Sequence, residues 1–178
     1  EKTALLGEGG GKEEAKAAKV SRGKNSVVNG NFEKVDAEGK PEGWNWGDWI
    51  RVVRETGNTF IRFEEKAIYK DGTCGYHAIR QTVEVSQKAL RVRIAARIRT
   101  VDVVPPTKTA FPGLMITFID KNGGKHSRVA KWQNKNGAWQ DIESEGPIPA
   151  ECFTAEFAVS SGYCPGQIDF DDVEVTFK

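Results

Sequence analysis

The clearest pattern along the chain is a ten-residue alternation of apolar and mostly basic side chains. Leu90, Val92, Ile94, Ala96 and Ile98 alternate with Arg91, Arg93, Ala95, Arg97 and Arg99. A period of two residues is typical of a β-strand with one face on a core and the other in solvent. The segment therefore predicts a strand that carries a row of arginines on its outer face.

Shorter runs of the same character fill most of the remaining chain. They lie at residues 27–28, 50–53, 59–63, 76–85, 114–119, 128–132, 137–142, 153–159 and 167–177, separated by turns rich in Gly, Pro, Asn and Asp. The run at 114–119 is apolar on both faces apart from Thr117, which predicts a central, covered strand. About nine to eleven short strands without a convincing core helix predict an all-β fold, a two-sheet antiparallel β-sandwich such as a jelly roll.

The last of these runs changes phase in its middle. Apolar residues fall on even positions up to Phe170 and on odd positions from Val173, with the pair Asp171 and Asp172 between them. Such a change predicts a β-bulge, which re-aims the side chains around it. A carboxylate beside a core is tolerated when it is paired, hydrogen-bonded or bound to a metal. The alternative is a pair of solvated acids near a turn.

Composition changes sharply near residue 25. Residues 1–25 are rich in Gly, Lys, Glu and Ala, and we expect a flexible leader or linker there, followed by one β-sandwich domain at 26–178. The net charge of +1 argues against a nucleic-acid partner, and no apolar run is long enough for membrane insertion.

Three cysteines allow at most one disulfide within the chain. Cys152 and Cys164 are the pair closest in sequence, and a bridge between them could join adjacent strands. The alternative is that these two and Cys74 are three small buried residues.

Several short motifs resemble one known family. They are Asn29-Gly30-Asn31-Phe32-Glu33, Gly43-Trp44, Gln81-Thr82-Val83, Gly137-Ala138-Trp139 and Asp171-Asp172-Val173. Together they resemble the carbohydrate-binding modules with a galactose-binding-like jelly roll, of the type associated with xylanases and cellulases. The resemblance spans about residues 27 to 177.

The resemblance implies a structural calcium where the first and last strands meet. Glu33 and one of Asp171 or Asp172 would supply oxygen ligands, completed by backbone carbonyls. A further ligand is expected from the region that contains Glu64, Glu65 and Asp71.

Sugars stack their apolar faces on aromatic rings, and the chain holds five tryptophans. By resemblance, Trp44 and Trp139 occupy core positions. The remaining platform candidates are Trp46, Trp49, Tyr76 and Trp132, each of which has a core position as its alternative. By resemblance, Arg80 and Gln81 share the ligand-facing strand with Tyr76; the alternative for Gln81 is a hydrogen bond within the sheet.

The arginine row allows two interpretations. Guanidinium groups at 91, 93, 97 and 99 suit an anionic polysaccharide, because their fork geometry matches carboxylates and sulfates. The interpretation that we favour is a solvated face balanced by acids on neighbouring strands.

These features lead us to expect a non-catalytic, secreted or cell-surface module. It would be a monomer that binds a polysaccharide or oligosaccharide and targets an appended enzyme to it. One alternative is a structural or protein-interaction sandwich of a cell-surface protein. Another is a polysaccharide lyase or glycoside hydrolase on the same scaffold, although His77 and His126 stand without the spacing of a catalytic or metal motif.

Overall fold

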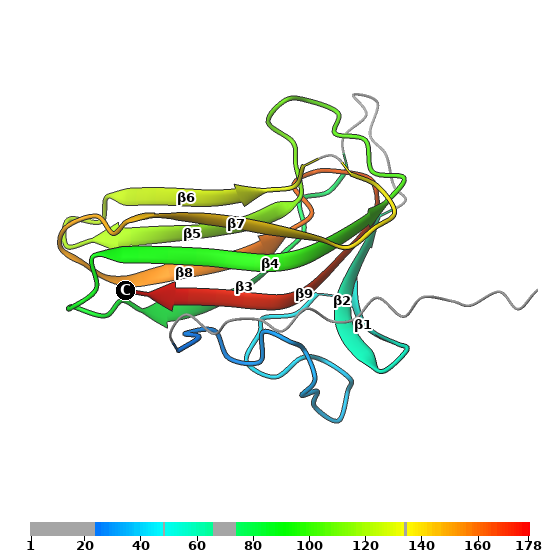
Figure 1. The fold of residues 1–178 in the computed structure, drawn as a ribbon, viewed down its shortest axis with the longest axis horizontal. Helices are drawn as coiled ribbons and strands as arrows, with labels where there is room; N and C mark the ends of the chain where they lie inside the picture. The colour runs from blue at the N-terminus through cyan, green and yellow to red at the C-terminus, as the bar shows by residue number, and fades with distance from the viewer. Residues whose placement is uncertain (1–23, 48, 66–73, 134) are drawn as a thin grey trace, which may run out of the picture.

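In the part of the chain that the structure describes, nine antiparallel strands form two sheets packed face to face (Figure 1). The computed structural model describes residues 24–47, 49–65, 74–133 and 135–178. The strands are β1 (Ile50–Glu55), β2 (Asn58–Glu65), β3 (Ala78–Glu84), β4 (Arg91–Val101), β5 (Gly113–Asp120), β6 (Lys125–Lys131), β7 (Gln140–Pro147), β8 (Cys152–Ser160) and β9 (Gly166–Phe177). The predicted two-sheet sandwich is confirmed. Within the described ranges, no helix has the length and apolar character needed to cross a bilayer.

The five-stranded sheet has the order β1-β2-β9-β4-β7 and the four-stranded sheet the order β3-β8-β5-β6. In Figure 1 the strands β7, β4 and β9 lie in front of β6, β5, β8 and β3. The predicted alternation is confirmed from Val92 onward, since Val92, Ile94, Ala96 and Ile98 are all buried between the sheets, whereas Leu90 lies before β4 and is exposed. The expectation that β5 is central is also confirmed, but its outer face is open: Ile119 is exposed there and Met115 is half-buried.

The core lies between the sheets and is built from large apolar side chains of both. Phe63 of β2 and Phe170 of β9 meet edge to face with ring centroids 5.9 Å apart. Phe118 and Phe157 extend from the opposite sheet, and all four rings are almost completely buried. Burying a ring of this size contributes about 1.5–3 kcal/mol, so these four rings make a substantial contribution to the hydrophobic stabilisation of the sandwich.

The bulge predicted in the last strand is confirmed. The register of β9 against β4 shifts between the pairs Ala95↔Glu174 and Arg97↔Asp171, so two residues of β9 face one residue of β4. Asp172 lies in the shift with a φ of 52°. An extra residue at this point returns Val173 and Val175 to the core side.

A segment at residues 25–30 joins the edges of the two sheets, as Figure 1 shows along the lower side of the sandwich. The amide of Ser26 donates to the carbonyl of Val175 at 2.8 Å, in the five-stranded sheet. The amide of Val28 donates to Gln81 Oε1 at 3.0 Å, and Gln81 Nε2 donates to the Val28 carbonyl at 2.7 Å, in the four-stranded sheet. The first segment and the last strand therefore lie together as expected, although residues 27–28 do not form a regular strand.

The predicted leader falls at residues 1–25, of which 1–23 lie outside the described residues. Asn25, at its end, belongs to the folded part. Its side chain accepts a hydrogen bond from the amide of Val175 and donates one to the carbonyl of Val173, both at 2.9 Å. The side chain therefore takes the place of a strand partner along this part of β9.

Candidate functional site

The outer face of the five-stranded sheet is covered by ion pairs. Arg91 binds Glu145 at 3.1 Å, and Arg93 binds Glu143 at 2.7 Å and Glu174 at 3.0 Å. Arg97 lies 4.0 Å from Asp172. Each arginine of the predicted row thus has an acid on a neighbouring strand, and the interpretation as a balanced face is confirmed.

The same face carries a buried carboxylate at Asp169, which has no exposed side-chain surface. Arg62 of β2 and Arg99 of β4 both donate to it, with Nε–Oδ distances of 2.7 and 2.9 Å. The hydrogen bond that Arg62 donates to Asp169 raises the pKa of Arg62 against the opposing effect of burial. A hydrogen bond from Arg99 likewise lowers the pKa of the nearby Glu55. These charged side chains pair with one another, and few of their hydrogen-bonding groups are left for a ligand.

Trp139 lies on this ion-paired face and not in the core, which corrects the expectation from the motif. The guanidinium carbons of Arg97 and Arg99 lie 5.1 and 5.0 Å from its ring centroid, and Phe60 meets it edge to face at 5.4 Å. Because cations cover the ring, it offers no open platform for stacking.

The outer face of the four-stranded sheet is more open and mixes small, polar and apolar side chains. Its registers place four residues side by side in each row across β3, β8, β5 and β6. The two central rows are Arg80, Ala158, Met115, Val129 and then Thr82, Glu156, Thr117, Ser127. Arg80 forms an ion pair with Glu156 at 3.2 Å, and the hydroxyls of Thr117 and Ser127 are 2.9 Å apart. Such a surface presents donors and acceptors around a shallow apolar floor.

Two exposed tyrosines stand beside each other at one end of this face. Tyr76 precedes β3 and Tyr163 follows β8, with 36% and 49% of their surfaces exposed. Their ring centroids are 5.0 Å apart at an interplanar angle of 43°. Tyr76 was among the predicted platform residues, whereas Tyr163 was missed. A signal existed, because an aromatic residue inside a Gly- and Pro-rich turn has no core strand to occupy.

A third ring extends the same end toward β5 and β6. Phe111 is half-buried in the loop before β5, and Lys131 Nζ of β6 lies 4.4 Å from its ring centroid. The loop is held against the turn that carries Tyr163, since a Cβ on Gly162 would lie 1.6 Å from the Phe111 carbonyl oxygen. Gly162 therefore allows the close approach that brings these rings to one end of the sheet.

Trp46 and Trp49 lie beside β3 and are half-buried against the core. The Trp49 ring stacks on His77 with centroids 4.5 Å apart, next to Tyr76 in the sequence. The amide of Asn45 donates to the Arg80 carbonyl at 3.3 Å, which holds the segment before Trp46 along the edge of β3. Trp49 therefore lies near the end of the face where the tyrosines stand, and Trp46 lies along the edge of β3.

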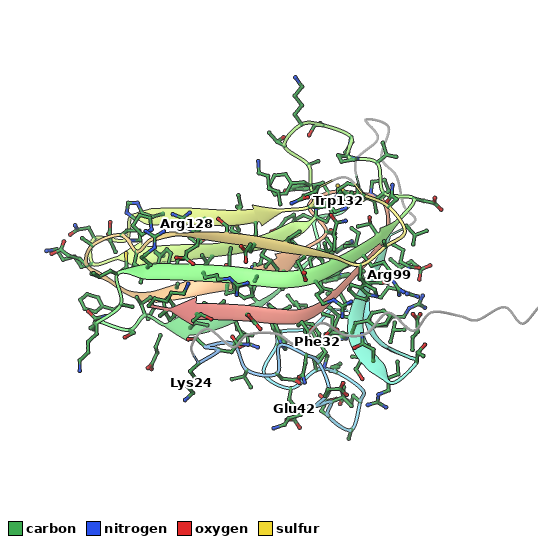
Figure 2. The ribbon with its side chains drawn as sticks, viewed as in Figure 1. Lys24, Phe32, Glu42, Arg99, Arg128 and Trp132 are labelled. Carbon is green, nitrogen blue, oxygen red and sulfur yellow. The ribbon has the colours of Figure 1, made fainter. Side chains whose placement is uncertain are left out.

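Two predicted ligand residues have structural positions instead. Gln81 is only 8% exposed, and both ends of its amide bind Val28. Trp132 is 6% exposed, and its amide donates to the Pro112 carbonyl where the chain leaves β6 (Figure 2). Gln81 joins the first segment to the four-stranded sheet, and Trp132 packs on the core. Neither side chain therefore belongs to the candidate face.

The acids predicted for calcium lie near the β1–β2 turn. Thr59 Oγ donates to Glu33 Oε2 at 2.9 Å, and Asn58 Nδ2 donates to Asp171 Oδ2 at 3.1 Å. Asp171 is buried, and its Oδ1 accepts a hydrogen bond from the Asp172 amide. The residues that meet these acids, Asn58 and Thr59, were not predicted for this role. Glu64 instead binds Arg51, while the Glu65 side chain and Asp71 lie outside the described residues.

A shallow groove of about 270 Å³ lies beside the bulge. It is lined by Asn25, Val27, Asn29, Gly30, Asn31, Asp172, Val173 and Glu174. Among the residues that the structure describes, no three His, Cys, Asp or Glu side chains gather closely enough to hold a metal. Of the predicted calcium ligands, only Asp172 lines this groove. A hard cation bound by Glu33 and one of the two Asp residues would therefore also need amide and backbone oxygens, which is a donor set that calcium accepts.

Of the two alternatives for the cysteines, a bridge between Cys152 and Cys164 is not supported, and all three cysteines are buried. Cys152 is the first residue of β8, and Cys164 follows the far end of that strand. Both are buried thiols that donate to nearby carbonyls, of Ala150 and Gly162 respectively. The two residues are close in sequence but far apart in space, because an extended strand separates them.

Several solved structures share this fold. The enzymatically active domain of tailspike protein 4 from bacteriophage CBA120 superposes with a TM-score of 0.63 at 14% identity, over 86% of this chain and 21% of the tailspike chain. A family 16 carbohydrate-binding module gives 0.58 at 15% identity, over 85% of this chain and 99% of the module. A family 61 module, in complex with β-1,4-galactotriose, gives 0.52 at 16% identity, over 87% and 99%. No protein-family profile and no curated protein sequence matches the chain.

The resemblance to carbohydrate-binding modules is thus confirmed at the level of the fold. The chain matches nearly the whole length of two such modules but about a fifth of the tailspike chain. The identities are low, and the fold by itself does not determine what the outer face binds.

Proposed function

We propose that this chain is a non-catalytic module that binds a polysaccharide or oligosaccharide across the outer face of the four-stranded sheet. The observation that carries the proposal is the exposed Tyr76–Tyr163 pair, at the end of the sheet face that is not filled by ion pairs. Aromatic rings offer an apolar surface on which the carbon-bound hydrogens of a sugar ring can stack.

The central rows of the same face suit sugar hydroxyls. The ion pair of Arg80 with Glu156 and the hydroxyls of Thr117 and Ser127 provide donors and acceptors beside the rings. Trp46 and Trp49 flank this surface and remain candidates for contacts at its edge. Because a shallow face leaves much of the ligand in water, we expect modest affinity.

The proposal includes the setting of the module. We expect a monomeric, secreted or cell-surface domain attached to an enzyme that acts on the same polysaccharide. The fold shared with known modules, and with one part of a much longer tailspike chain, supports a domain of this kind. We also propose a structural calcium held by Glu33 and one of Asp171 or Asp172, together with nearby amide and carbonyl oxygens.

A glycan array followed by affinity electrophoresis in soluble polysaccharides tests the proposal. Retention by at least one glycan, lost when Tyr76 and Tyr163 are replaced, is the expected result. Failure to bind any glycan would favour a structural or protein-interaction sandwich. After incubation with the same polysaccharides, new reducing ends and unsaturated products are measured. Either product would show that the protein is an enzyme and would contradict the proposal of a non-catalytic module.

A further inference from the structure

Cys74 and Cys164 lie beside each other at the end of the β3–β8 pair, although they are far apart in the sequence. The pairing of the two strands reaches Ala78↔Ser160, and the Ser161 amide continues it by donating to the His77 carbonyl at 2.9 Å. Beyond this point the amide of Cys74 donates to the carbonyl of Tyr163 at 3.3 Å. That carbonyl belongs to the peptide bond that enters Cys164.

Both side chains are buried, with at most 1% of their surfaces exposed. Burial, together with the neighbouring Cys74, raises the pKa of the Cys164 thiol to about 12. The amide of Cys74 thus contacts the peptide unit that enters Cys164, which makes the two backbones neighbours; a disulfide requires Cα atoms about 4.4–6.8 Å apart. Cys152 lies at the other end of β8 and has no comparable neighbour among the cysteines.

We propose that Cys74 and Cys164 form a disulfide when the protein folds under oxidising conditions, and that Cys152 remains a thiol. Two thiols lose two protons and two electrons, and a sulfur–sulfur bond forms. With oxidised glutathione as the oxidant, one thiolate attacks its disulfide and releases one glutathione; the second thiolate then displaces the other. The two electrons thus reduce one oxidised glutathione to two thiols.

Burial decides when the bridge forms. A thiol whose pKa is raised so far carries almost no thiolate near neutral pH, and the thiolate is the nucleophile. The bridge therefore forms before the segments around Cys74 and Cys164 become buried, and it forms slowly in the folded protein. Once made, it ties the segment that carries Tyr76 to the turn that carries Tyr163, and it is equally protected from reductants.

The test uses the full chain, refolded from denaturant in a mixture of reduced and oxidised glutathione. Peptide mapping without reduction is expected to show one linkage, between Cys74 and Cys164, and thiol titration in denaturant is expected to find one remaining thiol per chain. A linkage through Cys152, or three titratable thiols after oxidative refolding, would overturn the proposal. Neither readout depends on a glycan, so the result is separate from the proposed function.

Variants separate the bridge from general effects of the oxidant. Cys152→Ser is expected to keep the linkage, and Cys164→Ala is expected to leave two titratable thiols. The melting temperature of the oxidised wild type should fall by several degrees when it is unfolded, reduced and refolded with reductant, because a bridge across a long loop restricts the unfolded chain. The same treatment should not change the melting temperature of Cys74→Ala. An equal fall in that variant would contradict the Cys74–Cys164 disulfide.

Discussion

The amide of Val173 donates a hydrogen bond to the carbonyl of Gly30 at 2.8 Å, and a Cβ on Gly30 would lie only 2.0 Å from the Val173 carbonyl oxygen. The first segment and the bulged strand therefore touch through their backbones. Gly30 is the residue that makes the contact possible, because any side chain would have to displace main-chain atoms.

Replacing this glycine by alanine should lower the stability of the sandwich. For Gly30→Ala we expect a loss of about 1–3 kcal/mol in the free energy of unfolding, the usual cost of overpacking. Urea denaturation followed by tryptophan fluorescence measures it. Asn31→Ala, at the exposed neighbouring position, serves as a control with an expected change below about 0.5 kcal/mol. Equal stabilities for the two variants would contradict the close approach.

The buried carboxylate of Asp169 should contribute more than the exposed acids of the same face. Asp169→Asn removes the charge that Arg62 and Arg99 share, and we expect about 2–4 kcal/mol of destabilisation because those guanidiniums lose their buried partner. Glu143→Gln breaks a pair in which the acid is largely exposed, and should cost less than about 1 kcal/mol. Thermal and urea unfolding of both variants measure the difference, and a larger effect at Glu143 would refute it.

Glycan binding should depend on the tyrosine pair. We expect Tyr76→Ala and Tyr163→Ala each to weaken binding by about tenfold, the effect of losing about 1.4 kcal/mol of ring contact. Isothermal titration with the best glycan of the array measures this. The control is Phe153→Ala, which removes an exposed aromatic ring at the opposite end of β8. If Phe153→Ala weakened binding as much as the tyrosine variants, the face would be assigned incorrectly.

Calcium should stabilise the fold if the acids near the β1–β2 turn bind it. A ligand present at 100 times its dissociation constant adds about 2.7 kcal/mol to the free energy of unfolding. We therefore expect calcium to raise the melting temperature of chelator-treated protein, and Glu33→Gln with Asp171→Asn to abolish the rise. Glu38→Gln changes an exposed acid of the same segment and should keep it. An unchanged melting temperature in the wild type would count against the site.

The strands were predictable because half-buried strands carry a two-residue period that a single sequence displays. The alternation in β4 and the phase change at Asp171 are both local, and each led to the correct structure. The same two-residue period would also have placed Trp139 on the outer face. It lies three positions from the buried Ile142 and so faces the other side of the sheet. The motif suggested the core instead.

The candidate face depends on contacts that local patterns do not contain. Tyr163 and Phe111 lie in loops. Tyr163 meets Tyr76, and Phe111 approaches Gly162, only because β8 pairs with both β3 and β5. Gln81 was expected to face a ligand, yet its amide is occupied by a segment more than fifty residues earlier. Pairings between distant segments decide which polar groups remain available to bind a ligand. A single sequence does not reveal these pairings, so it cannot identify those groups.

The place of β9 between β2 and β4 has a consequence for how the protein is made. β2 and β4 have no strand between them until β9 is synthesised, and β9 is the last of the nine strands to leave the ribosome. The five-stranded sheet therefore cannot be completed during translation of the earlier strands. Their apolar faces stay uncovered in the meantime. We infer that nascent chains stalled before β9 depend on chaperones, and that closure of the sandwich waits for the twelve residues of β9.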